Sequence, residues 1–132
     1  ENFYRIADEA GIMIWQDFPL QWGYTDETSF IKEVIKQAKD MVDMLYNHPS
    51  IIAWCLHNEP PWDSSWMKYK YKDYNPQQNK KLDEALFKAL EGYDKTRYLH
   101  KYSSNIEHPW FGWYSGTWKD YARKTSQPLI TE

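Results

Sequence analysis

Residues 51–60, Ile-Ile-Ala-Trp-Cys-Leu-His-Asn-Glu-Pro, constrain the fold of this chain more than any other stretch. The stretch opens with an apolar run without alternation, which is typical of a strand buried on both faces of a sheet. Asn58-Glu59 and the double proline Pro60-Pro61 then end the strand, because proline has no backbone N–H to donate within a central strand. The stretch therefore predicts a buried parallel strand with a carboxylic acid at its carboxyl end.

Helical and strand-like patterns alternate along the whole chain, which favours an α/β fold with a parallel sheet. Right-handed crossovers then bring all the carboxyl ends of the strands to one edge, where α/β barrels place their catalytic groups. The expected elements are helices over 2–10, 28–45, 76–91 and 118–124, and strands over 12–15, 51–56, 98–102, 110–113 and 128–131.

Two glutamates, Glu59 and Glu132, end strands that this topology brings to the same edge. A pair of carboxyl groups is what cleavage of a glycosidic bond needs: one protonates the leaving oxygen, and the other attacks the anomeric carbon or activates water. Asn58 is placed to donate a hydrogen bond to the sugar 2-hydroxyl, and Asp17 is expected to bind a sugar hydroxyl or a neighbouring site residue. The strand ends therefore predict a glycosidase site.

The aromatic content of 18%, with 8 Trp and 11 Tyr, has two interpretations. The rings either fill a large core or stack on the C–H faces of sugars, with polar groups close by to bind hydroxyls. Trp110, Trp113 and Tyr114 are the preferred subsite walls. Further candidates in polar loops are Trp22, Tyr24, Trp62 and Trp66.

The charge and hydropathy patterns argue against two classes of partner. The net charge of −3 is spread without a basic stripe, so no nucleic-acid partner is expected, and no apolar run reaches the length of a membrane span. His57 and Cys55 lie near the acids, but their spacing matches no zinc motif; a hydrogen-bonded histidine and a small buried cysteine are the preferred interpretation. No metal or organic cofactor is expected, and the pattern indicates no compartment.

Two segments resemble the catalytic barrel of glycoside hydrolase family 2, which includes β-galactosidases, β-glucuronidases and β-mannosidases. They are residues 3–18, Phe-Tyr-Arg-Ile-Ala-Asp-Glu-Ala-Gly-Ile-Met-Ile-Trp-Gln-Asp-Phe, and residues 47–54, Asn-His-Pro-Ser-Ile-Ile-Ala-Trp, leading into Asn58-Glu59-Pro60. Residues 112–114 and 128–132 resemble its later strands. The resemblance implies a partial TIM (β/α)8 barrel, approximately strands three to seven with their helices. Residues 1–132 would then be a single fragment of the barrel domain, whose missing strands and β-sandwich domains belong to the parent chain.

The resemblance also implies a retaining exo-β-glycosidase that acts on O-glycosidic bonds of an oligosaccharide or glycoside. By that resemblance, Glu59 is the acid/base and Glu132 the nucleophile of a double displacement. The sequence Trp-Gln-Asp-Phe at 15–18 favours a β-mannosidase-like branch. The alternatives are a β-galactosidase or β-glucuronidase of the same family, and a non-catalytic carbohydrate-binding or structural barrel fragment that is inactive in isolation.

Overall fold

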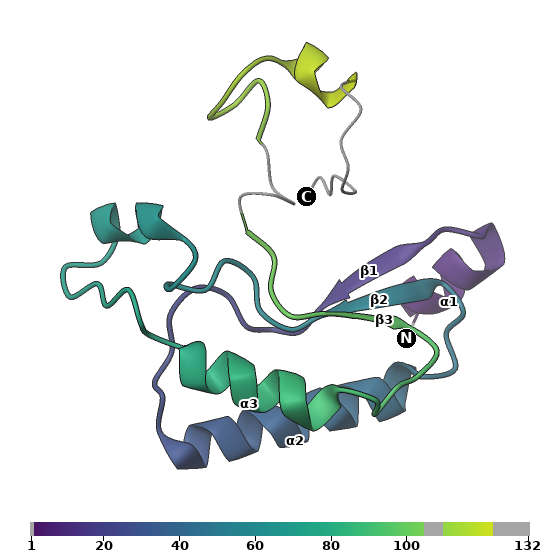
Figure 1. The fold of residues 1–132 in the computed structure, drawn as a ribbon. Coiled ribbons are helices and arrows are strands. Elements are labelled where there is room, and N and C mark those ends of the chain that lie inside the picture. The colour runs from purple at the N-terminus through teal and green to yellow at the C-terminus, as the bar shows by residue number, and fades with distance from the viewer. Residues whose placement is uncertain (1, 105–109, 123–132) are drawn as a thin grey trace.

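The computed structural model describes residues 2–104 and 110–122 as an α/β arrangement around a parallel sheet (Figure 1). The sheet has three strands in the order β1-β2-β3, which confirms the expected fold class. The elements in chain order are α1 (Asn2–Ala10), β1 (Ile14–Asp17), α2 (Thr28–Leu45), β2 (Ile51–Cys55), the 3-10 helix η1 (Ser65–Tyr69), α3 (Lys80–Leu90), β3 (Tyr98–His100) and the 3-10 helix η2 (Trp118–Ala122).

The register of the sheet places the strand ends next to one another. Asp17 of β1 lies beside Cys55 of β2, and Cys55 lies beside His100 of β3. Single bridges continue the same parallel pairing past the strands, from Gln21 to Asn58 and from Asn58 to Ser103. The predicted common edge of strand ends is therefore present in the described part of the chain.

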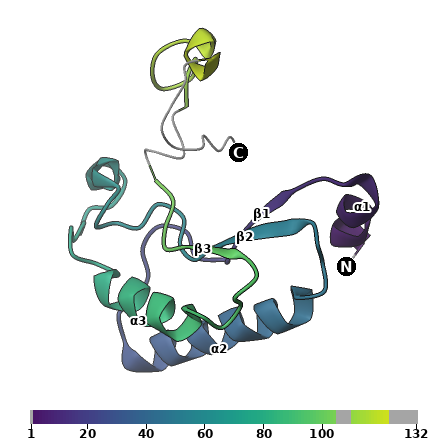
Figure 2. The same cartoon turned by 45° about the vertical axis from the view of Figure 1, so that its right-hand side comes forward.

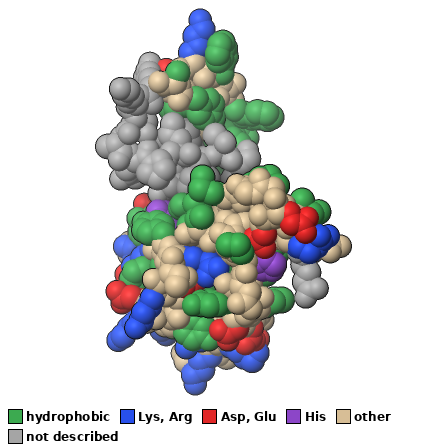
Figure 3. Space-filling view, turned by 90° about the vertical axis from the view of Figure 1, so that its right-hand side faces the viewer, with side chains coloured by type: hydrophobic (Ala, Val, Ile, Leu, Met, Phe, Trp, Pro, Cys, Tyr) green, Lys and Arg blue, Asp and Glu red, His purple; other side chains and the backbone are tan. Residues whose placement is uncertain are grey.

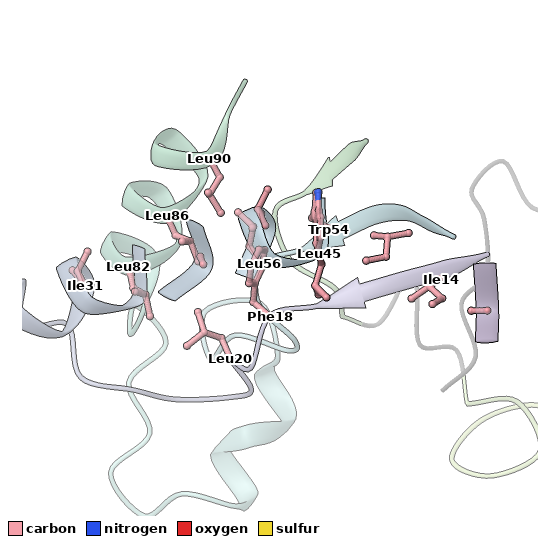
Figure 4. Close-up of a cluster of buried hydrophobic side chains, with 14 residues drawn as sticks. Ile14, Phe18, Leu20, Ile31, Leu45, Trp54, Leu56, Leu82, Leu86 and Leu90 are labelled. Carbon is pink, nitrogen blue, oxygen red and sulfur yellow. The ribbon is translucent and has the colours of Figure 1, made fainter. Parts of the chain in front are cut away.

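Helices α2 and α3 pack against each other and cover one face of the sheet (Figure 2), whereas α1 lies near the amino ends of the strands. Their apolar stripes meet side chains of the sheet in one core, shown in Figure 4. These helices are amphipathic: apolar residues recur about once per helical turn, so their side chains lie on the face that packs against the core. The core residues labelled there are Ile14, Phe18, Leu20, Ile31, Leu45, Trp54, Leu56, Leu82, Leu86 and Leu90.

Helix α1 ends at Ala10, and a glycine follows it. Gly11 has φ 67°, the left-handed conformation that glycine adopts without steric cost, and Ile12 donates its backbone N–H to the Ala7 carbonyl at 2.9 Å. Ile12 and Met13 then lie exposed, so strand β1 begins later than the apolar run predicted, at Ile14.

Helix α3 begins later than its sequence pattern predicted. Residues 76–79 form turns, and the helix starts at Lys80. Asn79 is held at φ 70° because its side chain bonds both backbone groups of Tyr24, at 2.8 and 3.0 Å, and its N–H donates to Asp26. A contact between distant segments therefore overrides the local helix signal.

The segment after β3 differs from expectation. Residues 110–113 form a turn closed by a bridge between Phe111 and Ser115, so the prediction of a strand over 110–113 is wrong. The short helix expected over 118–124 is present as η2, and the strand expected over 128–131 lies outside the described residues.

The side of the molecule that carries α1 has apolar side chains at its surface, mixed with charged ones (Figure 3). Exposed apolar residues of α1 and of the turn that follows it are Phe3, Ile6, Ile12 and Met13. Of the helices in the described ranges, none combines the length and the apolar character that crossing a membrane requires.

Candidate active site

Backbone hydrogen bonds carry the parallel pairing beyond the strands and hold Glu59 at the carboxyl edge of the sheet. Trp22 donates its N–H to the Asn58 carbonyl at 3.0 Å, and Ser103 donates to the His57 carbonyl at 3.0 Å. The N–H of Glu59 in turn donates to the Ser103 carbonyl at 2.7 Å. The segment that carries Glu59 is therefore fixed from both sides.

Glu59 and Trp22 both have backbone conformations that bulky side chains rarely adopt. Their φ angles are 50° and 68°, and such residues cost about 1–3 kcal/mol each, which surrounding contacts must offset. The Trp22 indole Nε1 donates a hydrogen bond of 3.1 Å to Glu59 Oε2. The strained turns after β1 and β2 thus bring an indole N–H against the candidate catalytic carboxylate.

A buried hydrogen-bond network supports the pair formed by Trp22 and Glu59. His57 is fully buried; its Nε2 lies 2.7 Å from the Trp22 carbonyl oxygen, and its Nδ1 lies 2.6 Å from Asp83 Oδ1. Because a carbonyl oxygen can only accept, Nε2 is the donor of the first bond. Asp83 Oδ2 also accepts a bond of 2.6 Å from Trp62 Nε1. Helix α3 is therefore connected through His57 to the backbone of Trp22, and the histidine is hydrogen-bonded, as expected.

A cavity of about 700 Å³ opens at this edge of the sheet. That volume lies within the range of small-molecule sites, and the lining combines a carboxylate, side-chain amides and aromatic rings. The lining residues are Gln21, Trp22, Asn58, Glu59, Trp66, Lys70, Trp110 and Tyr114.

Six of the residues expected from the sequence line this cavity: Asn58, Glu59, Trp110 and Tyr114, and the further candidates Trp22 and Trp66. Tyr24 and Trp62 are not among the lining residues. Trp113 is exposed and does not contribute to the cavity lining given by the described residues. Asp17 ends β1 outside the lining; it accepts a bond of 3.0 Å from Trp15 Nε1. Burial, with the Asp17 charge as a second cause, raises the pKa of the neighbouring Cys55 thiol. Glu132, the other expected glutamate, lies outside the described residues, so its distance from Glu59 is not described either.

Sequence reasoning missed two features of the site. The link between His57 and Asp83 joins residues 26 positions apart, so no local pattern signals it. Lys70 lines the cavity from the loop after Glu59; the only signal was its place in an aromatic-rich loop too long for a simple connection.

The family model "Glycosyl hydrolases family 2, TIM barrel domain" matches residues 1–131. The chain belongs to glycoside hydrolase family 2. Relatives include β-mannosidase B of Aspergillus clavatus, 31% identical over 98% of this chain, and a putative β-glucuronidase of Formosa agariphila, 29% identical over 91% of it. The family 2 chain spans only 15% of the length of each of these relatives.

Solved structures of this family have the same fold. The β-D-mannosidase of Dictyoglomus thermophilum aligns with a TM-score of 0.64 and 26% identity, over 83% of this chain and 16% of that one. A β-glucuronidase of Parabacteroides merdae aligns with a TM-score of 0.68 over 92% of this chain and 16% of that one; at 23% identity it shows the fold alone. The parallel strands and helices of this family 2 chain are thus part of a TIM barrel, which places catalytic residues where strands end.

Proposed function

We propose that the protein is a retaining exo-β-glycosidase in which Glu59 is the acid/base and Glu132 the nucleophile. The observation that carries the proposal is the place of Glu59: directly after β2 of a family 2 barrel, in a cavity it shares with Asn58 and aromatic rings. Barrel enzymes use this edge of the sheet for catalysis, and glycosidases need a carboxyl group at such a position.

The reaction proceeds in two displacements. Glu132 attacks the anomeric carbon while Glu59 gives its proton to the departing glycosidic oxygen, which leaves as an alcohol. Glu59 then takes a proton from water, whose oxygen attacks the anomeric carbon and releases Glu132 as a carboxylate. Each cycle therefore consumes one water and restores both side chains.

Asn58 is oriented for a part in this reaction. Its Oδ1 accepts a hydrogen bond of 3.1 Å from Ser103 Oγ, which supports the amide nitrogen as the group that donates to the substrate. A donor to the 2-hydroxyl stabilises the oxocarbenium-like transition state, where that contact strengthens. Trp110 and Tyr114 provide aromatic faces for stacking on a sugar ring.

We propose a β-mannoside as the first substrate to examine. The Trp-Gln-Asp-Phe segment at 15–18 supports this choice, as do several relatives named β-mannosidase B. β-Glucuronides are the second class, because a relative of similar identity is named a putative β-glucuronidase. β-Galactosides complete the panel.

The experiment uses the complete protein that contains these residues and a panel of aryl β-glycosides. The wild type should hydrolyse one glycone with initial release of the β anomer, and Glu59→Ala should lower kcat/KM by about 10²–10⁴-fold for poor leaving groups. Azide should restore activity to Glu59→Ala and give a β-glycosyl azide. With Glu132→Ala, azide should also restore activity but give an α-glycosyl azide. Initial release of the α anomer, or a Glu59→Ala variant with unchanged kinetics, would contradict these roles.

A carbohydrate-binding barrel without catalysis is the second candidate, because aromatic rings account for much of the cavity lining. In that case the wild type would bind a glycan without hydrolysing it, and Glu59→Gln would leave the affinity unchanged.

A further inference from the structure

Lys70 brings a positive charge into the cavity that contains Glu59. It lies after η1, in the loop that follows Glu59, where lysine and tyrosine alternate over residues 68–72. Figure 1 shows this loop (teal) beyond the carboxyl ends of the strands, on the side away from α1. Lys70 is thus a charged part of the cavity lining that the proposed hydrolysis does not use.

The ammonium group of Lys70 is held against aromatic rings rather than against a carboxylate. Its Nζ lies 2.8 Å from the centroid of the Trp22 ring and 5.8 Å from that of Trp66. Among the residues in the described ranges, no acidic side chain forms an ion pair with Lys70. Within the described ranges the cation is therefore positioned by cation–π contacts, and no described acidic side chain takes up its N–H donors.

The Trp22 indole connects this cation to the catalytic carboxylate. Its Nε1 donates to Glu59 Oε2, and its ring face carries the Lys70 ammonium group. A substrate whose glycosidic oxygen meets Glu59 therefore passes close to Lys70. An anionic substituent at that place gains a charge-assisted hydrogen bond, which a neutral one does not.

The exposure of these residues indicates which part of the substrate Lys70 meets. Asn58 and Glu59 are half-buried next to the sheet, whereas Lys70, in the same cavity lining, is exposed to solvent. In an exo-acting enzyme the terminal sugar enters the inner end and the leaving group stays toward solvent. Lys70 therefore lies on the leaving-group side.

We propose that Lys70, with Trp22 and Trp66, forms a leaving-group subsite for a carboxylate or sulfate group next to the scissile bond. The inference rests on the proposed glycosidase function and adds an acidic leaving group to it. A smaller cavity farther along the same loop contains Lys72, but Glu59 does not line it, so the subsite next to the scissile bond is assigned to Lys70.

The test compares two aryl β-glycosides with the glycone that the complete protein hydrolyses best. One has a 4-(carboxymethyl)phenyl and the other a 4-(carbamoylmethyl)phenyl leaving group. The methylene insulates the phenol, so the two leaving groups differ in charge and little in reactivity. A 4-(sulfomethyl)phenyl glycoside measures the preference for a sulfonate, as the analogue of a sulfate.

The wild type should prefer the carboxylate substrate by about fivefold in kcat/KM, the size of a modest ion pair, and the preference should shrink in 0.5 M NaCl. Lys70→Met should bring the ratio of the two substrates to about one, and Lys70→Arg should retain the preference. The ratio is the readout because a general disturbance of Trp22 and Glu59 affects both substrates alike. Lys68→Met is the matched control; Lys68 lies over the Tyr69 ring outside the cavity lining and should leave the ratio unchanged.

Three outcomes would overturn the subsite. They are equal kcat/KM for the two substrates in the wild type, a preference that survives in Lys70→Met, and a Lys70→Met effect confined to a charged glycone. Failure of the wild type to hydrolyse any glycoside of the panel is a different result: it rejects the proposed function, and the subsite with it.

Discussion

At the scale of single residues, the position of Glu59 depends on a side chain that lies 37 positions earlier in the sequence. Trp22 contacts the carboxylate through Nε1, and its own backbone is held by Asn58 and His57. The left-handed conformations of Trp22 and Glu59 persist because these bonds offset their strain. An apolar run followed by Asn-Glu predicted the carboxylate, but nothing local predicted the residue that positions it.

The Trp22→Phe variant tests this positioning, because it keeps an aromatic ring and removes the N–H donor. We expect kcat/KM to fall about tenfold for glycosides with poor leaving groups, which need a well-placed acid, and to change little for dinitrophenyl glycosides. The measurement is the dependence of log kcat/KM on leaving-group pKa. Trp66→Phe is the control, since Trp66 lines the same cavity without a described bond to Glu59. An equal loss across all leaving groups would show that Trp22 acts on binding instead.

At the scale of the elements, one arginine joins the turn between α2 and β2 to the start of β3. Arg97 donates from Nε to the Ile51 carbonyl at 2.9 Å and from Nη2 to the Tyr46 carbonyl at 2.6 Å. Its Nη1 donates to Asp94, which also accepts a bond of 2.9 Å from Trp54 Nε1. Burial by itself would raise the pKa of Asp94, but hydrogen bonds from Thr96, Trp54 and Arg97 outweigh it and hold that pKa well below its usual value.

The Asp94→Asn variant should therefore destabilise the barrel in a pH-dependent way. A depressed pKa in the folded state means that the carboxylate stabilises the fold fully above its ordinary value near 4, and that this stabilisation is lost as the pH falls below it. We expect a cost of about 1–3 kcal/mol at pH 7 that becomes smaller at pH 3.5. Urea unfolding of the complete protein at both values provides the measurement. Asp43→Asn, at an exposed carboxylate that accepts a bond from Tyr93, is the control. A cost that does not change with pH would contradict the charge-based explanation.

At the scale of the whole molecule, the described sheet has two edge strands and an apolar surface beside one of them. In the described sheet β1 and β3 each pair on one side only, and Ile12 and Met13 are exposed just before β1. Unpaired strand edges and apolar patches promote association between chains. In a complete TIM barrel, strand closure pairs every edge.

The 132-residue chain produced by itself should consequently self-associate in a concentration-dependent way. Sedimentation velocity over a range of concentrations measures this, with the complete protein as the reference. The double variant Ile12→Lys, Met13→Lys should associate less, because charged residues at an edge oppose pairing. A monodisperse, cooperatively unfolding monomer at all concentrations would contradict the expectation and show that this part of the barrel folds independently.

The sequence by itself determined those features that depend on neighbouring residues. Helices α1 and α2, the buried strand β2 and the place of Asn58 and Glu59 after it follow from periodicity, a glycine stop and a double proline, which act within a few residues. The tertiary structure decided where α3 begins, which rings surround Glu59 and that Lys70 enters the same cavity. These features depend on hydrogen bonds and packing between segments tens of residues apart, and such contacts exist only once the parallel strands bring those segments together.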